Sequence, residues 1–386
     1  MENLNLETEF IIPETFESTS SATSTDEVLN KISDFSKKGY QFLKEDNIEE
    51  ATQAFQSILE IDNDNNYALV GLGDTERKQN HFNDAIKYYQ KCLDVHPGNN
   101  YALFGLADCY KALNQYSKAI NIWKQYLVHD ENNITVISRV ADAYRKIHDF
   151  QKSKELYLKV LDMEEDNPYA LIGLGHLNYD FKEYKDALYY WSRVYEINQD
   201  NVDIRVITAI GNCHRKLKSF QQGTIYFQMA LDKEPQNFYA LFGLADCYRG
   251  MNQQYKSIEY WNKILDIDPN NKVILTRAGD AYRTTGNYEQ AKLYYNRALD
   301  IAFDIYAAIG LALICKGEGN YEEAALRFEN LIKNDPKNPR LYADLAECYL
   351  LMGKKKEAIK LLQDCLASDA RNIGARKLLE KITKGD

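Results

Sequence analysis

The sequence predicts an all-α solenoid of about ten stacked helix pairs, and three observations support this prediction. The ten residues YALFGLADCY occur at 101–110 and again, unchanged, at 239–248. Alignment of the chain with itself gives a match every 34 residues. Within each 34-residue repeat, apolar residues recur at helical spacing in two stretches, which a short polar turn separates. Neither helix can bury its apolar face alone, so consecutive pairs must stack.

The first helical stretch of each repeat fixes the register, which starts at Ile32. The ten repeats begin at residues 32, 66, 100, 134, 168, 204, 238, 272, 305 and 339. The fifth repeat has two additional residues and the eighth lacks one. The two copies of YALFGLADCY lie in the third and seventh repeats, so their separation is four periods plus the two-residue insertion. The duplicated segment is therefore part of a larger repeated unit.

The second helical stretch carries a size pattern that explains how the two helices pack. Position 8, in the first helix, is Gly or Ala in all ten repeats, and position 20 is also small. Position 24 is aromatic in nine repeats, namely Phe55, Tyr89, Trp123, Tyr157, Trp191, Phe227, Trp261, Tyr295 and Phe328. A ring that faces a position without a large side chain fills the space there, which predicts close helix packing.

These small and aromatic positions, with proline at position 32 in four repeats, resemble the tetratricopeptide repeat family. The resemblance covers about residues 32–372 and implies a right-handed superhelix whose concave groove is lined by the first helix of each repeat. Residues 373–386, with the segment IGARKLLEKITK, are similar to the capping helix that closes such arrays. Residues 1–31 are expected to form an acidic tail outside the repeats.

The tail contains seven acidic residues and one basic residue. Its run STSSATSTDE, at 18–27, has the low complexity that is typical of disorder. The preceding segment LETEFIIPETF mixes acidic and large apolar residues. Two alternatives remain open for the tail: it is solvated, or it docks into the groove of its own chain.

The candidate binding residues lie at positions 2, 5, 9 and 12 of the first helix, which share one helical face. The resemblance implies that this face lines the groove, and position 6 adds an arginine in the fourth and eighth repeats. The predicted partner-binding residues are Tyr67, Asp74, Arg77, Tyr101, Phe104, Asp108, Lys111, Arg139, Asp142, Arg145, Tyr169, His176, Asn212, Arg215, Tyr239, Phe242, Asp246, Arg249, Arg277, Asp280, Arg283 and Tyr306. Recurring rings beside paired charges are typical of binding surfaces.

Each of these features also has a structural interpretation. Aspartate at position 9 and arginine at position 12 are three residues apart, so they could simply pair on a solvated helix face. The tyrosines could pack between adjacent first helices. Family members that bind the carboxylate of chaperone tails carry lysine at position 5 and asparagine at position 9. Position 5 here is never lysine and position 9 is almost always aspartate. Arg139 and Arg277 match only the arginine that such members carry at position 6, so chaperone-tail binding is not expected.

Composition excludes several other classes of protein. No apolar run reaches the roughly 18 residues of a membrane helix, and no secretory signal pattern opens the chain, which predicts a cytoplasmic protein without membrane insertion. The seven cysteines lack CxxC spacing, so neither a zinc site nor a disulfide framework is expected. The net charge of −10 argues against nucleic acid as the ligand. No cofactor motif or catalytic set of histidines and carboxylates is present.

The sequence thus predicts a non-catalytic adaptor or scaffold that binds a partner polypeptide in the concave groove. An extended peptide with alternating apolar and polar groups would fit the alternation of rings and charges. The alternative is a regulatory or substrate-presenting subunit of a separate enzyme.

Overall fold

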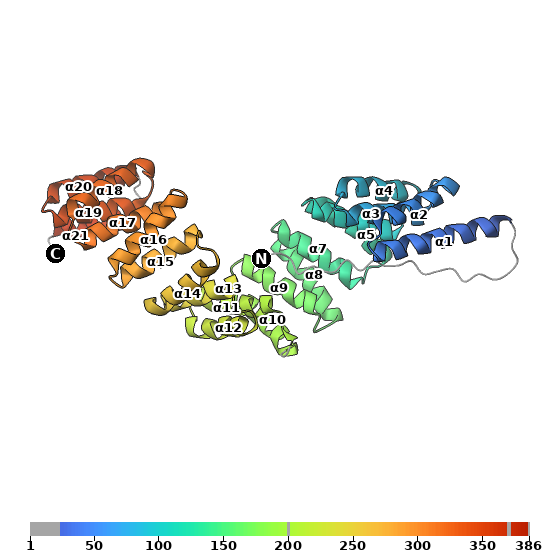
Figure 1. Ribbon diagram of the computed structural model, residues 1–386, viewed down its shortest axis with the longest axis horizontal. Helices are drawn as coiled ribbons and strands as arrows, with labels where there is room; N and C mark the ends of the chain where they lie inside the picture. Colours follow the sequence, from blue (N-terminus) through green and yellow to red (C-terminus); the bar gives the residue numbers. More distant parts are fainter. Residues whose placement is uncertain (1–23, 199–200, 369–371, 385–386) are drawn as a thin grey trace. The chain divides into compact units, whose positions relative to one another are not determined.

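The computed structural model describes residues 24–198, 201–368 and 372–384. These residues form 21 α-helices and no strand, which confirms the predicted all-α solenoid (Figure 1). The chain divides into an N-terminal unit, residues 1–197, and a C-terminal unit, residues 198–386. Each unit is described separately below.

The N-terminal unit contains five helix pairs. Its helices are α1 (Ser24–Lys44), α2 (Ile48–Ile61), α3 (Asn66–Lys78), α4 (Phe82–Val95), α5 (Asn100–Ala112), α6 (Tyr116–His129), α7 (Ile134–Lys146), α8 (Phe150–Met163), α9 (Pro168–Asp180) and α10 (Tyr184–Ile197). Odd-numbered helices are the first helices of the repeats. Each helix packs on the next one along the chain, and first helices of neighbouring repeats also contact each other, as α1 with α3, α3 with α5 and α7 with α9.

The C-terminal unit contains five further helix pairs and one additional helix. Its helices are α11 (Ile204–Lys216), α12 (Phe220–Lys233), α13 (Phe238–Gly250), α14 (Gln254–Ile267), α15 (Lys272–Thr284), α16 (Tyr288–Ile301), α17 (Ile305–Gly317), α18 (Tyr321–Asn334), α19 (Pro339–Leu351), α20 (Lys355–Ser368) and α21 (Ile373–Lys384). The same packing of neighbours occurs here, and α21 lies against both α19 and α20. Its role as a cap stays a prediction.

Local sequence explains where the helices begin and how each pair turns. Nine first helices, α3 to α19, follow an Asn or Asp whose side chain accepts a hydrogen bond from a backbone N–H of the first turn. Asn99, for example, accepts from the N–H of Ala102 at 2.9 Å. Position 15 of every repeat has a positive φ, from 57° at Asn114 to 84° at Gly319. This left-handed residue recurs ten times, so the backbone itself shows the ten predicted repeats.

The aromatic residue at position 24 occupies a space between two repeats. Tyr89 is fully buried, and a Cβ atom on Gly73 of the same repeat would lie 2.6 Å from its ring. A Cβ atom on Gly105 of the following repeat would lie 2.4 Å from the same ring. The sequence pattern predicted the first contact but not the second. One ring therefore closes its own helix pair and joins that pair to the next.

The start of α1 differs from the expected domain boundary. The helix begins at Ser24, so residues 24–31 are helical, although the sequence places them in the tail. The serine, threonine and two acids that open this helix favour a helix N-terminus, because they can accept from its free N–H groups and oppose its dipole. Residues 1–23, including the segment expected to dock or remain solvated, lie outside the described residues.

The cysteine thiols lie mostly in the interior of the repeats. All seven are free, and all except Cys315 are buried. Burial raises the pKa of the Cys213 and Cys247 thiols to about 12. A buried thiol that remains protonated packs as a small apolar group.

The shared ring contact leads to a prediction about Gly243, which faces Phe227 of the preceding repeat. A Cβ atom on Gly243 would lie 2.3 Å from that ring, so Gly243→Ala should lower the free energy of unfolding by about 1–3 kcal/mol. Urea unfolding followed by circular dichroism measures this change. Gly374→Ala is the control, because its Cβ would make only an ordinary contact, 3.5 Å from Asn372. Equal stability of the two variants would contradict the ring contact.

Candidate binding surface

The predicted binding residues lie on what we call the first-helix surface, formed by positions 2, 5, 6, 9 and 12 of the first helices. In the N-terminal unit these positions come from α3, α5, α7 and α9, and in the C-terminal unit from α11, α13, α15 and α17. First helices of successive repeats contact each other, as α3 contacts α5 and α11 contacts α13. Side chains about 31 residues apart can therefore meet.

The tyrosines at position 2 differ in their exposure. Tyr169, Tyr239 and Tyr306 are exposed, with 50%, 55% and 64% of their surface accessible. Tyr67 and Tyr101 are half-buried. Packing between adjacent helices, the structural interpretation, therefore fits Tyr67 and Tyr101, whereas the other three rings are accessible. Their exposed surface is available to a ligand.

The phenylalanines at position 5 are half-buried and support arginines. Phe104 packs edge-on against Tyr126, and the guanidinium of Arg139 lies 4.7 Å from the centre of its ring. Phe242 packs in the same way against Trp261, with Arg277 at 5.0 Å. These rings orient the arginines through cation–π contacts.

A chain of charged residues runs through three repeats of the N-terminal unit. Nη2 of Arg77 donates to Oδ1 of Asp74 at 3.0 Å, and Nη1 of Arg77 lies 3.8 Å from Oδ2 of Asp108. Nη1 of Arg139, from the next repeat, donates to Oδ1 of Asp108 at 2.8 Å. Arg139 and Asp108 are both buried. These residues therefore bind the repeats to one another.

Asp74 is held at the start of this chain by a buried tyrosine. The hydroxyl of Tyr89 donates to Oδ1 of Asp74 at 2.7 Å. Burial raises the pKa of Asp74, although Arg77 and the Tyr89 hydroxyl favour its charged form. The position-24 ring thus has a polar function as well as a packing function.

The other charged positions of this unit have more varied surroundings. Arg145 donates to Oδ1 of Asp142 at 2.7 Å and to Oδ2 of Asp180 at 2.6 Å. Lys111 is half-buried, and burial together with nearby Arg139 lowers the pKa of its ammonium group. His176 lies edge-on to Trp191, and burial and the charge of Arg145 lower its pKa to about 4. A neutral imidazole is thus stable beside Arg145 at neutral pH.

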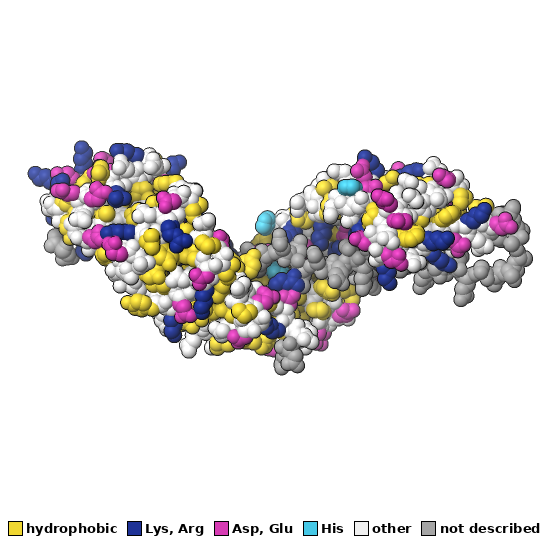
Figure 2. Space-filling model, in the orientation of Figure 1, with side chains coloured by type: hydrophobic (Ala, Val, Ile, Leu, Met, Phe, Trp, Pro, Cys, Tyr) yellow, Lys and Arg dark blue, Asp and Glu magenta, His cyan; other side chains and the backbone are white. Residues whose placement is uncertain are grey.

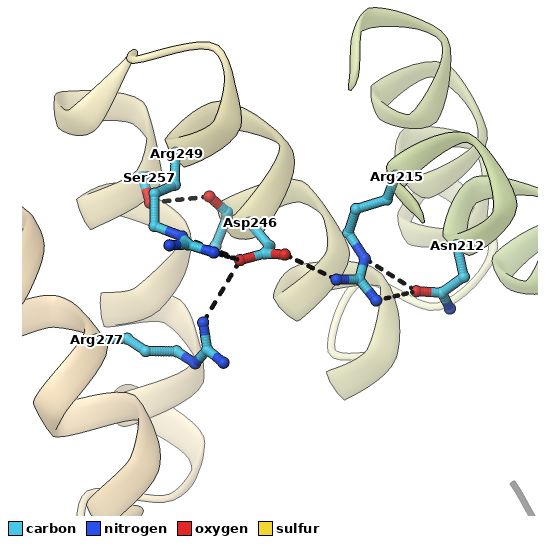
Figure 3. A network of polar contacts seen from close by, with 7 residues as sticks. Asn212, Arg215, Asp246, Arg249, Ser257 and Arg277 are labelled. Atoms are coloured by element: carbon cyan, nitrogen blue, oxygen red, sulfur yellow. Dashed lines mark hydrogen bonds and ion pairs between the residues drawn. The ribbon is translucent and has the colours of Figure 1, made fainter. Parts of the chain in front are cut away.

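In the C-terminal unit, one aspartate collects three guanidinium groups (Figure 3). Asp246 accepts from Arg249 at 2.6 Å, from Arg215 at 2.7 Å and from Arg277 at 3.4 Å. Burial opposes the charge of Asp246, but Arg249 and Arg215 outweigh it, so the pKa of this carboxyl is lowered.

The sixth and eighth repeats of the same unit hold the other predicted polar binding residues. Arg215 also donates to Oδ1 of Asn212, at 3.0 Å from Nη2. Asp280 accepts from the hydroxyl of Tyr295 at 2.7 Å, and Arg283 lies 3.7 Å from the same carboxylate. Asn212, Asp280 and Arg283 are half-buried.

The structure changes the interpretation of the charges. Sequence reasoning considered only the pairs within one helix, and these are present, as in Asp74–Arg77 and Asp142–Arg145. It missed the pairs between repeats, Asp108–Arg139 and Asp246–Arg277, because the arginines at position 6 were considered only as residues that bind a ligand. Both pairs are separated by 31 residues in sequence, which is the signal that could have identified them.

Further exposed apolar residues were missed. In the C-terminal unit, Phe238, Val273 and Phe303 are exposed near the starts of α13, α15 and α17. Phe238 lies next to position 2, Val273 occupies it, and Phe303 precedes the first residue of α17 by two residues.

Among the described residues, no helix is long and apolar enough to cross a membrane. No group of three or more His, Cys, Asp or Glu side chains within the same described ranges could hold a metal ion.

Comparison with known families agrees with this architecture. Four family models, each described as Tetratricopeptide repeat, match residues 76–138 and 317–382, 274–305, 140–202 and 239–271. Together they cover more than half of the chain. The chain belongs to the tetratricopeptide repeat family.

The solved structures that are similar to the chain have low sequence identity to it. A crystal structure of MamA protein is 22% identical and covers 44% of this chain and 92% of its own, with a TM-score of 0.40. YrrB, described as a TPR protein with an unusual peptide-binding site, is 19% identical over 48% of this chain and 95% of its own, with a TM-score of 0.41. Yeast Tom70 is 14% identical over 94% and 96%, with a TM-score of 0.40. Likeness at this level carries no conclusion about ligands. No curated protein matches the chain.

The buried pair of Asp108 and Arg139 should be important for stability. Asp108→Ala leaves the Arg139 guanidinium buried without its carboxylate, which should cost about 3–5 kcal/mol of unfolding free energy. Urea unfolding measures the loss. Glu259→Ala, which breaks a pair with Lys263 on the exposed face of α14, is the matched control and should cost far less. Similar losses in the two variants would show that Asp108 does not act through burial.

The low pKa of His176 makes stability dependent on pH. The pKa is about 4 in the folded chain, against roughly 6.5 in an unfolded one. Between these values only the unfolded chain binds the proton, so stability falls as pH falls from 7 to 5, by about 1–2 kcal/mol from this residue. His176→Gln should remove that part of the pH dependence in urea titrations. His129→Gln, at an exposed position, should leave it unchanged.

Proposed function

We propose that the protein is a non-catalytic adaptor or scaffold that holds a partner polypeptide on the first-helix surface of its repeats. The observation that carries this proposal is the exposure of large rings at one repeat position, in Tyr169, Tyr239 and Tyr306. Exposed aromatic residues with neighbouring charges are the residues that dominate the binding energy of protein interfaces. Proteins with tetratricopeptide repeats are typically interaction modules, which agrees with this function.

The residues of the surface favour a polypeptide over other ligands. Exposed rings that recur at one repeat position offer apolar contacts to side chains of an extended or helical segment. The net charge of −10 disfavours a nucleic acid, whose phosphates require a basic footprint. The seven free thiols suit the reducing environment of the cytoplasm. In this proposal the repeats of 32–372 carry the surface and α21 closes the array.

The charges take a different part in binding from that first expected. Asp108 and Arg139 are buried in their own pair, so they position the surface and do not reach a partner. The accessible tyrosines, with Arg249 and Arg277, contact the partner in this proposal. A variant with Arg145 changed would break its bonds to Asp142 and Asp180, so a loss of binding there would not separate contact from folding.

A displayed peptide library tests this function. Segments selected on the intact chain should bind about 5- to 30-fold more weakly to Tyr239→Ser or Tyr306→Ser, because each change removes an exposed aromatic contact. Tyr255→Ser is the matched control, since Tyr255 is an exposed tyrosine on a second helix, α14, and should not affect binding. Binding is measured by fluorescence anisotropy with the purified proteins.

Two results would contradict the proposal. One is that no segment is selected, and the other is that Tyr255→Ser weakens binding as much as Tyr239→Ser. Purification from the native cell with a stoichiometric catalytic chain would instead favour a regulatory or substrate-presenting subunit of an enzyme.

A further inference from the structure

The two units carry the same pattern of charged positions but differ in their balance. In the N-terminal unit, four acidic side chains face four basic ones: Asp74, Asp108, Asp142 and Asp180 with Arg77, Lys111, Arg139 and Arg145. In the C-terminal unit, the corresponding positions hold two acidic and four basic residues: Asp246 and Asp280 with Arg215, Arg249, Arg277 and Arg283. Asn212 and Gly317 occupy the positions of Asp74 and Asp180. At these compared positions the C-terminal unit therefore has two positive charges more than negative ones, and we call these two charges unmatched.

The unmatched charge is concentrated around Asp246 (Figure 3). Arg215, Arg249 and Arg277 share this one carboxylate, and the other group in the close-up that accepts from one of these arginines is the neutral amide of Asn212. In the N-terminal unit the equivalent arginine, Arg77, has the full charge of Asp74 at 3.0 Å. The three guanidinium groups around Asp246 are like charges and repel one another, so a further anion would stabilise the cluster.

Two of the three guanidinium groups are accessible. The side chains of Arg249 and Arg277 are 49% and 34% exposed, whereas Arg139, the counterpart of Arg277, is 5% exposed. Among the described residues, Asp246 is the acceptor for Arg277, at a long 3.4 Å. Burial and the charges of Arg249 and Arg215 lower the pKa of Arg277, although Asp246 opposes this shift. Arg277 therefore has N–H donors to offer, and Phe242 and Trp261 hold it in place.

Apolar surface lies along the same helix. Tyr239 is seven residues before Asp246 on α13, which puts both on one helical face, and Phe238 is exposed beside it. The tyrosine ring packs edge-on against Phe238. Figure 2 shows hydrophobic side chains gathered over the C-terminal unit next to basic ones.

We infer that the guanidinium groups of Arg215, Arg249 and Arg277 form the docking site for an acidic segment of the partner polypeptide. Two carboxylates of that segment match the two unmatched charges, and the accessible donors of Arg249 and Arg277 bind them as charge-assisted hydrogen bonds. A neighbouring apolar residue of the segment contacts Tyr239 and Phe238. This inference rests on the proposed function and states which partner segment the surface selects.

The key variant is Asn212→Asp, which removes no arginine. It adds a carboxylate where the N-terminal unit already has Asp74, so the fold tolerates it, and it neutralises part of the excess charge at Arg215.

The probe is a labelled, C-terminally amidated 12-residue peptide with two glutamates beside a leucine, and its twin with glutamines. We expect the glutamate peptide to bind the intact chain at least about tenfold more tightly than its twin, and more weakly at high salt. Asn212→Asp and Arg249→Gln should each weaken it about fivefold or more.

Lys263→Gln is the matched control, because Lys263 is a basic residue as exposed as Arg249 but lies on a second helix, α14, outside the first-helix surface, and it should leave the affinity unchanged. Equal affinity for the two peptides, or no effect of Asn212→Asp, would overturn the inference. If library peptides without acidic preference still lost binding in Tyr239→Ser, the proposed function would stand and only this inference would fall.

Two other occupants would also overturn it. An RNA oligonucleotide that outcompetes the glutamate peptide and is sensitive to Asn212→Asp would identify the site as one for phosphates. Removal of residues 1–23, whose charged residues are all acidic, would strengthen peptide binding if the chain's own N-terminal segment occupied the site. Unchanged affinity after that removal supports a separate partner.

Discussion

The structure depends on the contact of one aromatic ring with two positions that lack large side chains, one in its own repeat and one in the next. Tyr89 between Gly73 and Gly105 is the clearest case. In an array where each repeat contacts only its neighbours, such a contact fixes both the packing of the two helices within a repeat and the packing of that repeat on the next one. It brings the first helices close enough for side chains 31 residues apart to meet, and the charged network follows from that closeness.

The ion pairs between repeats then make the surface rigid. Burying a charge is favourable only with a well-placed partner, so Asp108 and Arg139 accept a single arrangement of their two helices. The hydroxyl of Tyr89 adds a hydrogen bond to Asp74 and thereby couples the packing ring to the charges. A rigid surface loses little entropy when a ligand binds, and this is an advantage for the exposed rings that lie on it.

Much of the fold could be predicted from the sequence, because size and polarity repeat with the period of the structure. The 34-residue period, the small residues and the rings predicted ten helix pairs, and the recurring left-handed residue at position 15 agrees with them. The inter-repeat pairs could not be predicted from one helix at a time, because burial of Arg139 depends on where α5 and α7 lie. The sequence placed the first residues of α1 in the tail because low complexity is typical of disorder, whereas the order of Ser24, Thr25, Asp26 and Glu27 favours a helix start.

The duplicated segment YALFGLADCY shows that a local sequence does not determine its own chemistry. Both copies place an aspartate at the same position, yet Asp108 meets a neighbouring repeat with Asp74, and Asp246 meets one with Asn212. One copy is therefore part of a balanced, closed network and the other is part of a network with excess positive charge and accessible donors. In an array of similar repeats, a change of one residue in the adjacent repeat alters the site without altering the fold, because stacking uses the rings and the small residues. Under the proposed function, differences between repeats, more than their shared pattern, determine what the surface selects.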